Sequence, residues 1–96
     1  MRIRKGSHTW FLMDFVRECA EGEVPFWHFD TFYDGNVVHY FPKMRRENPM
    51  LAEMFTDLLD SAVDYARDFN LSEDEYRQLI TERYEMLVGK RPVDIY

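Results

Sequence analysis

The spacing of hydrophobic residues predicts four helices, at residues 8–20, 26–33, 49–68 and 72–88. In each stretch apolar side chains recur every three or four residues, which places them on one face of a helix. In the first stretch, Leu12, Phe15 and Cys19 share a face. Asp14 and Glu18 fall on the opposite face. This alternation is typical of an amphipathic helix packed against a core.

The residues between these stretches favour the same boundaries. Residues 21–25 contain a glycine near the end of one helix and a proline near the start of the next. Asn48 and Pro49 form an N-cap followed by a proline at the first helical position. Ser72 and Glu75 have the spacing of a capping box. Short connections of this kind predict an antiparallel bundle.

The segment between the second and third predicted helices carries no helix prediction. Asp34-Gly35-Asn36 indicates a turn. Residues 37–41 are apolar and β-branched enough for a strand, but no second strand-like run could pair with them, so we expect an ordered aromatic loop. Residues 42–47 form a basic connector with Lys43, Arg45 and Arg46. The predicted fold is therefore all-α, an antiparallel four-helix bundle with one short second helix and an ordered aromatic loop.

Composition sets the scale of this fold. The chain of 96 residues, 46% hydrophobic and 17% aromatic, is expected to form a single domain over residues 1–96, with residues 1–7 flexible. Its one cysteine allows no intrachain disulfide. No apolar run approaches the roughly 18 residues of a membrane span, and the N-terminal stretch lacks the pattern of a secretory signal. These features predict a soluble, cytoplasmic protein without a membrane partner.

Five carboxylates on the third predicted helix recur every three or four residues and form one narrow row: Glu53, Asp57, Asp60, Asp64 and Asp68. We call these five residues the acidic stripe. Only Arg67 lies among them. Like charges at this spacing repel by roughly 0.2–0.5 kcal/mol per pair, and aspartate dominates although glutamate is the better helix former. The stripe is either a solvated helix face or a surface for a cationic partner.

The overall charge favours a basic protein as that partner. The net charge is −6, and residues 53–85 hold ten acidic and three basic side chains. An acidic surface of this size repels phosphate backbones, so we expect no direct binding of nucleic acid.

Basic residues close to the stripe leave another interpretation open. Arg83 falls on the inner face of the fourth predicted helix, where a guanidinium needs a carboxylate or a route to water. If Arg83, Arg67 or the basic connector folds onto the stripe, the stripe is partly structural, and only its unpaired members are candidates for binding.

No residue pattern predicts catalysis, a metal or a cofactor. Cys19 lies on an apolar helix face without a neighbouring base, which makes a thiol inert. His8, His28 and His39 lack the paired spacings of zinc sites. No glycine-rich phosphate loop is present. A small-ligand site or an enzyme would need a pocket with convergent polar groups, which the sequence does not indicate.

Aromatic residues are concentrated in residues 26–41, which hold seven of the sixteen in the chain. Most of them are expected in the core of so small a bundle. Trp27 falls outside the inward face of its helix. Trp27, Tyr40 and Phe41 are therefore our candidates for anchors of a protein partner.

Several short segments resemble the immunity proteins of the colicin D type, a family that also accompanies toxins of contact-dependent growth inhibition systems. The similar segments are Asp14-Phe15-Val16, Gly22-Glu23-Val24-Pro25, Phe29 with Phe32-Tyr33, Leu58-Leu59 with Val63-Asp64-Tyr65, and Leu71-Ser72-Glu73-Asp74-Glu75-Tyr76-Arg77. The likeness spans residues 12–88. The segment 37–46 departs from the family by being longer and more aromatic.

This resemblance implies a four-helix protein without enzymatic activity, which binds a cognate tRNA-cleaving ribonuclease toxin in the cytoplasm. In that family, acidic residues take the place of substrate phosphates in the basic active-site cleft. The matching positions here are Glu53, Asp57, Asp60 and Asp64. The alternative function is a non-inhibitory acidic adaptor or regulator that docks on a basic protein. The sequence does not determine the oligomeric state.

Overall fold

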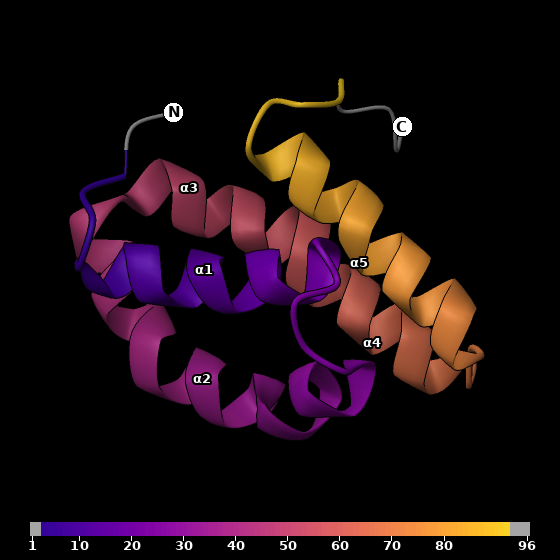
Figure 1. Cartoon of the computed structure of the whole chain (residues 1–96). Helices are drawn as coiled ribbons and strands as arrows, with labels where there is room; N and C mark the ends of the chain where they lie inside the picture. Colours follow the sequence, from indigo (N-terminus) through magenta and orange to yellow (C-terminus); the bar gives the residue numbers. More distant parts are fainter. Residues whose placement is uncertain (1–2, 93–96) are drawn as a thin grey trace.

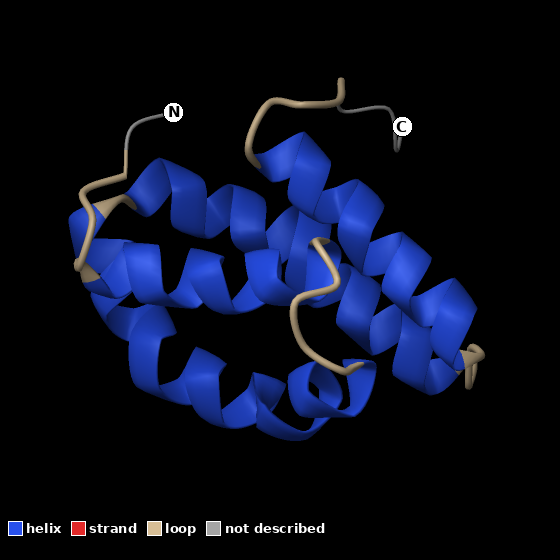
Figure 2. Ribbon diagram, in the orientation of Figure 1, coloured by secondary structure: helices blue, strands red, loops and turns tan. Residues whose placement is uncertain are grey.

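The computed structural model describes residues 3–92. Within this range every regular element is helical (Figure 2). In chain order the elements are α1 (His8–Ala20), α2 (Phe26–Glu47), α3 (Pro49–Met54), the π-helical segment η1 (Phe55–Asp60), α4 (Ser61–Asp68) and α5 (Glu73–Leu87). The elements α3, η1 and α4 follow one another without a break, so the chain makes four helical rods (Figure 1). The predicted all-α four-helix bundle is confirmed.

The first turn of α1 is capped by two side chains. Ser7 precedes the helix, and its hydroxyl accepts a hydrogen bond from the Trp10 amide at 3.1 Å. Glu47, at the end of α2, accepts hydrogen bonds from the Thr9 amide at 2.8 Å and the Thr9 hydroxyl at 2.7 Å. The otherwise unpaired amides at a helix N-terminus are thus satisfied partly from another helix. This cap fixes the start of α1 against the end of α2.

The stretch 1–7, which we predicted to be flexible, lies partly outside the described residues. Of its described part, Ile3 packs against the hydrophobic core. Ser7 is buried and caps α1.

The main difference from the sequence prediction is the length of α2, which has 22 residues and ends at Glu47. The prediction of a short second helix at 26–33 is wrong, because the helix continues well past Tyr33. Three further predictions are wrong for the same reason: the turn at 34–36, the ordered aromatic loop at 37–41 and the separate basic connector at 42–47.

Residues that usually interrupt helices are tolerated in α2 because they lie on its exposed side. Pro42 lacks the amide that would bond the Val38 carbonyl, but both residues are exposed, so water can reach that carbonyl. Gly35 is exposed too. On the inner side, Tyr33 and Met44 are buried at helical spacing. Burial of that side offsets the weak helix propensity of the outer side.

The predicted helix 49–68 forms, but its middle third is the π-helical segment η1. Asn48 caps its start by accepting a hydrogen bond from the Leu51 amide. The Ser61 amide donates to Thr56 oxygen, five residues back instead of four. The backbone carbonyl of Asp57, which would bond the Ser61 amide in an α-helix, accepts a hydrogen bond from the Ser61 hydroxyl at 2.6 Å. The π-helical turn therefore does not leave this carbonyl unpaired.

The last helix and the core agree with the prediction. Ser72 and Glu75 form the expected capping box at the start of α5. The helix ends at Leu87, with Val88 as its C-cap. The largest fully buried side chains come from all four rods: Leu12, Val16, Cys19, Phe29, Tyr33, Met44, Leu51, Phe55, Leu59, Val63, Ile80 and Leu87. One core thus holds the rods together.

Candidate binding surface

The acidic stripe is distributed over three consecutive elements of one rod. Glu53 belongs to α3, Asp57 and Asp60 to η1, and Asp64 and Asp68 to α4. All except Asp60 are exposed, and Asp60 is half-buried. Among residues 3–92, none of the five carboxylates forms an ion pair. Mutual repulsion within the stripe is therefore not compensated by an ion pair with a described residue.

Asp60 differs from the other stripe residues because it has a structural partner. Its carboxylate accepts a hydrogen bond from the Tyr33 hydroxyl of α2 at 2.7 Å. Burial of the ring and the hydrogen bond to Asp60 raise the pKa of Tyr33 well above its usual value. Asp60 thus links η1 to α2 and is less available to a partner.

Arg67 turns away from the stripe and binds two carboxylates of α2. Its guanidinium donates to the Asp34 carboxylate at 3.0 Å and lies 3.4 Å from the Asp30 carboxylate. The guanidinium carbon also lies 5.7 Å from the centre of the Tyr33 ring. Asp30 and Asp34 are exposed and adjoin the stripe across this bridge. We call the stripe together with Asp30 and Asp34 the acidic surface.

Arg83 supports the stripe without touching its carboxylates. Its guanidinium donates to the Leu58 carbonyl of η1 at 2.8 Å. Its inward position is thus explained by a backbone hydrogen bond on the π-helical turn. The π-helical turn sets how Asp57 is oriented relative to Asp64, because it adds one residue to the helical turn between them.

The basic end of α2 does not neutralise the stripe either. Arg45 lines the same shallow hollow as Glu53 and Asp57, but it forms no ion pair with a residue in the part of the chain that the structure describes. None of Arg67, Arg83 and the segment 42–47 therefore forms an ion pair with a stripe carboxylate among the described residues, although Arg45 lies in the hollow beside Glu53 and Asp57.

The three predicted aromatic anchors do not lie together. Phe41 packs on Phe55, with ring centres 5.9 Å apart, and lines the hollow beside Glu53. Tyr40 instead stacks on Phe11 of α1, with ring centres 5.8 Å apart. Trp27 is 60% exposed. The structure thus places Phe41 beside the stripe and Tyr40 on the side of α2 that faces α1.

Trp27 shares a side of α2 with carboxylates of the acidic surface. Residues 27, 30 and 34 follow helical spacing, so Trp27 lies in the row of Asp30 and Asp34. This row was missed because we ended the second helix at residue 33.

A further aromatic pair beside the stripe was also missed by the sequence reasoning. Tyr65 and Phe69 are 53% and 68% exposed, and their ring centres are 4.7 Å apart. They directly follow Asp64 and Asp68 in the chain. The signal was their spacing of four residues, which puts them on one side of a helix next to two carboxylates.

Cys19 is the one cysteine of the chain and is fully buried. Burial raises the pKa of the Cys19 thiol to about 11. Among the described residues, no group of three or more His, Cys, Asp or Glu side chains could hold a metal ion.

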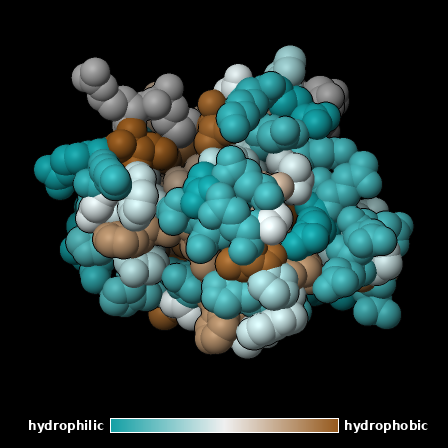
Figure 3. Space-filling view, viewed as in Figure 1, coloured by the Kyte–Doolittle hydropathy of each residue, from teal (hydrophilic) through white to brown (hydrophobic). Residues whose placement is uncertain are grey.

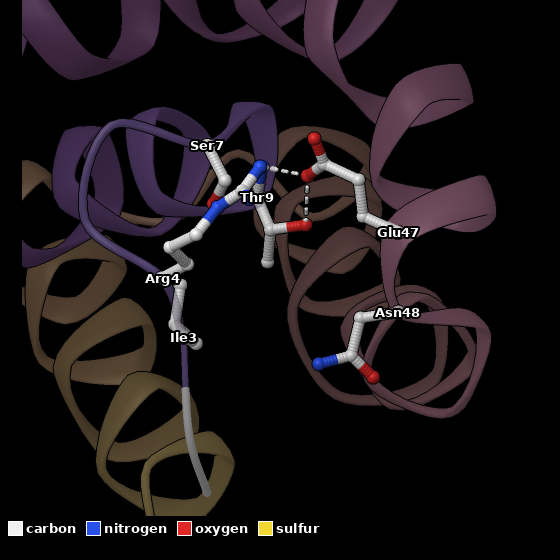
Figure 4. A pocket seen from close by; sticks show the side chains of 6 residues that line it. All are labelled: Ile3, Arg4, Ser7, Thr9, Glu47 and Asn48. Carbon is white, nitrogen blue, oxygen red and sulfur yellow. Dashed lines mark hydrogen bonds between the residues drawn. The ribbon is translucent and has the colours of Figure 1, made fainter.

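A hollow of about 320 Å³ lies at the junction of α1 and α2, lined by Ile3, Arg4, Ser7, Thr9, Glu47 and Asn48 (Figure 4). Figure 4 shows both hydrogen bonds from Thr9 ending on the Glu47 carboxylate. Because this carboxylate already caps α1, we assign the hollow to the structure of the bundle.

On the face that carries α1 and α5, hydrophilic side chains predominate and hydrophobic ones show in separate areas (Figure 3). Within residues 3–92, none of the helices combines the length and hydropathy that a membrane span requires.

No protein-family model matches the chain, and neither does any curated protein or solved structure. The functional assignment therefore depends on the chain's own surface.

Proposed function

We propose that this protein is an immunity protein, which binds a basic nuclease toxin domain and covers its active site with the acidic surface. One observation carries the proposal: the carboxylates of the acidic stripe have no ion pair among residues 3–92, although their spacing makes them repel one another. A cationic partner would relieve that repulsion. The resemblance to colicin D type immunity proteins supports the same assignment, with a tRNA-cleaving toxin in the cytoplasm as the partner.

The chemistry of the partner follows from its substrate. A nuclease cleft is cationic because it must hold phosphodiesters, so a rigid acidic surface can compete for it. Opposite charges also steer the two proteins together, at rates up to about 10⁸–10⁹ M⁻¹s⁻¹ at low salt. Rapid capture would protect the producing cell. This role requires no catalytic residue, metal or cofactor of the inhibitor.

The contacts divide the acidic surface into residues that hold the bundle and residues left for binding. Asp60 accepts from Tyr33 and Asp34 binds Arg67, so both are engaged within the chain. Asp57 and Asp64 are exposed and form no ion pair with a described residue. We therefore assign the main charge contacts with the toxin to these two residues, with Glu53 and Asp68 beside them.

Affinity must come mainly from apolar anchors, because exposed ion pairs each contribute only about 0–1 kcal/mol. Trp27 and Phe41 flank the acidic surface on α2. Tyr65 and Phe69 flank it on the other rod. Tyr40 stacks on Phe11 of α1 and lies outside the expected contact area, so we assign it to the packing of α2 on α1 and not to toxin binding.

The decisive experiment is protection of cells that express the nuclease encoded beside this gene. We expect D57K/D64K to abolish protection and to restore RNA cleavage, because both substitutions reverse charges at the cationic cleft. Circular dichroism should show an unchanged helix content, since neither side chain is buried. A protective D57K/D64K variant would show that the stripe is not the binding site.

The charge-matched control is E18K/E82K, which changes the net charge by the same amount at two half-buried positions on other helices, with its fold checked by the same circular dichroism measurement. Neither Glu18 nor Glu82 forms an ion pair with a described residue. This variant should protect as well as the native protein. Binding of a basic protein without inhibition of any nuclease would instead assign the acidic adaptor function.

A further inference from the structure

A second surface of the molecule has the opposite chemistry to the acidic surface. On the outer side of α2, a shallow groove of about 590 Å³ is lined by Gly35, Val38, His39, Pro42, Lys43 and Arg46. We call it the α2 groove. Its apolar part is exposed, since Val38 keeps 76% of its surface accessible. Gly35 has no side chain, and a Cβ placed there would meet nothing within 4 Å.

The cationic side chains of the α2 groove have no carboxylate partner among the described residues. Lys43 and Arg46 form no ion pair in residues 3–92. Asp34 also borders the groove, but its charge is engaged by Arg67. The groove thus combines an apolar strip with two unpaired cations, with the Arg67-bound Asp34 at one end, and its cationic part fits an apolar segment flanked by carboxylates.

The chain itself presents such a segment on α4. Tyr65 and Phe69 are exposed and their tilted rings contact each other, and Asp64 and Asp68 lie next to them. The two rings are one helical turn apart in the chain, about 6 Å along the axis. We call these four residues the α4 ridge.

The two surfaces match in spacing as well as in charge. Val38 and Pro42 are one helical turn apart on α2, and the same interval separates Tyr65 of α4 from Phe69, the C-cap of that helix. A pair of rings laid along the groove would therefore meet a pair of apolar side chains at the same interval.

We propose that the α2 groove receives the α4 ridge of a second copy of this chain. In this head-to-tail contact, Asp64 and Asp68 face Lys43 and Arg46. Because the groove and the ridge are different surfaces, the contact is heterologous. It goes beyond the proposed immunity function, and where it forms it covers two carboxylates of the acidic stripe.

Such an association is weak and sensitive to salt. The contact is small and its ion pairs are exposed to water, so we expect a dissociation constant on the order of 10⁻⁴–10⁻³ M. A basic partner that binds the acidic stripe more tightly then displaces the second copy. At this affinity the contact forms only near millimolar protein concentrations, and a toxin readily displaces it.

Sedimentation velocity of the purified full chain tests this contact. Between about 0.01 and 1 mM protein in about 20 mM salt, the native protein should shift from monomer toward larger species, and about 0.5 M salt should reverse the shift. D64K/D68K and K43E/R46E should each remain monomeric. The control E18K/E82K should associate like the native protein.

Mixing the two variants supplies the sharper test. An equimolar mixture of D64K/D68K and K43E/R46E should associate again, because each groove then meets a ridge of opposite charge. A native protein that stays monomeric at about 1 mM in low salt overturns the proposal, as does association that persists in either variant alone. The measurement uses no toxin, so a negative result would refute the self-association alone. The immunity function would still be tested separately by the protection experiment with D57K/D64K.

Discussion

At the scale of single residues, several charged side chains bind backbone groups instead of one another. Arg83 donates to the Leu58 carbonyl of η1, and Arg77 donates to the Val24 carbonyl before α2. Glu47 accepts from the Thr9 amide at the start of α1. Each bond joins segments that are at least 25 residues apart in the chain. Such contacts decide how the helices end and turn, because a backbone group away from water needs a partner.

The cap formed by Glu47 leads to a prediction for stability and its pH dependence. E47Q keeps the shape of the side chain but removes its charge, so it should lower the free energy of unfolding by about 1 kcal/mol at neutral pH. Hydrogen bonds from Thr9 lower the pKa of Glu47 from 4.5 to about 2. Because the pKa is lower in the folded state, this contribution is complete above about pH 4.5 and is lost as the pH falls toward 2. Urea unfolding of both proteins across this window measures the difference.

E53Q is the control for that measurement, because Glu53 is exposed and has no ion pair with a described residue. Its free energy of unfolding should stay within about 0.5 kcal/mol of the native value. A difference between E47Q and the native protein that remains constant down to pH 2 would contradict the cap.

At the scale of the elements, α2 shows how burial overrides local propensity. Gly35 and Pro42 are both poor helix residues, yet α2 passes through both. Phe29, Tyr33 and Met44 bury the inner side over more than four turns. The same continuity places Trp27 in one row with Asp30 and Asp34 and creates the α2 groove on the outer side.

If residue 35 is helical, alanine should suit it better than glycine. G35A should raise the free energy of unfolding by about 0.5–1 kcal/mol, since the added Cβ meets nothing within 4 Å and the unfolded chain loses freedom. Thermal unfolding at about 10 µM protein, well below the concentrations expected for self-association, measures this change. The matched control is G22A, where φ is +72° and alanine is strained. That variant should be destabilised, and a destabilised G35A would contradict a continuous α2.

At the scale of the whole molecule, charge is separated between two surfaces. The acidic surface lies where α2 meets the α3–η1–α4 rod, and the unpaired cations Lys43 and Arg46 lie on the outer side of α2. Arg67 bridges to α2, and no described residue forms an ion pair with the stripe. The fold therefore retains an electrostatic cost that a basic partner can remove.

This unrelieved repulsion predicts that salt stabilises the protein. Raising the NaCl concentration from about 10 mM to about 1 M shortens the Debye length from about 30 Å to about 3 Å. The urea midpoint of the native protein should rise as a result, because the stripe repels itself at low salt. D57N/D64N should be more stable than the native protein at low salt and should gain less from added salt. A native midpoint that stays constant or falls would contradict the repulsion.

Much of the fold could be predicted from local patterns, and the exceptions share a cause. The starts of α3 and α5 follow from Asn48 and Ser72, whose capping bonds are local. The length of α2 and the π-helical turn could not be read in the same way, because each depends on a contact distant in the chain. Arg83 supports η1 from α5. Tyr33 and Arg67 join α2 to η1 and α4.

For the candidate site, the sequence by itself determined the acidic stripe, its excess of carboxylates over cations and the helix that carries it. Only the tertiary structure decided which carboxylates remain available, since Asp60 binds Tyr33 while Asp57 and Asp64 form no ion pair with a described residue. It also added Asp30 and Asp34 from α2 to the acidic surface. The physical reason is range: helical spacing orders charges within one rod, whereas hydrogen bonds between rods depend on how the core packs them.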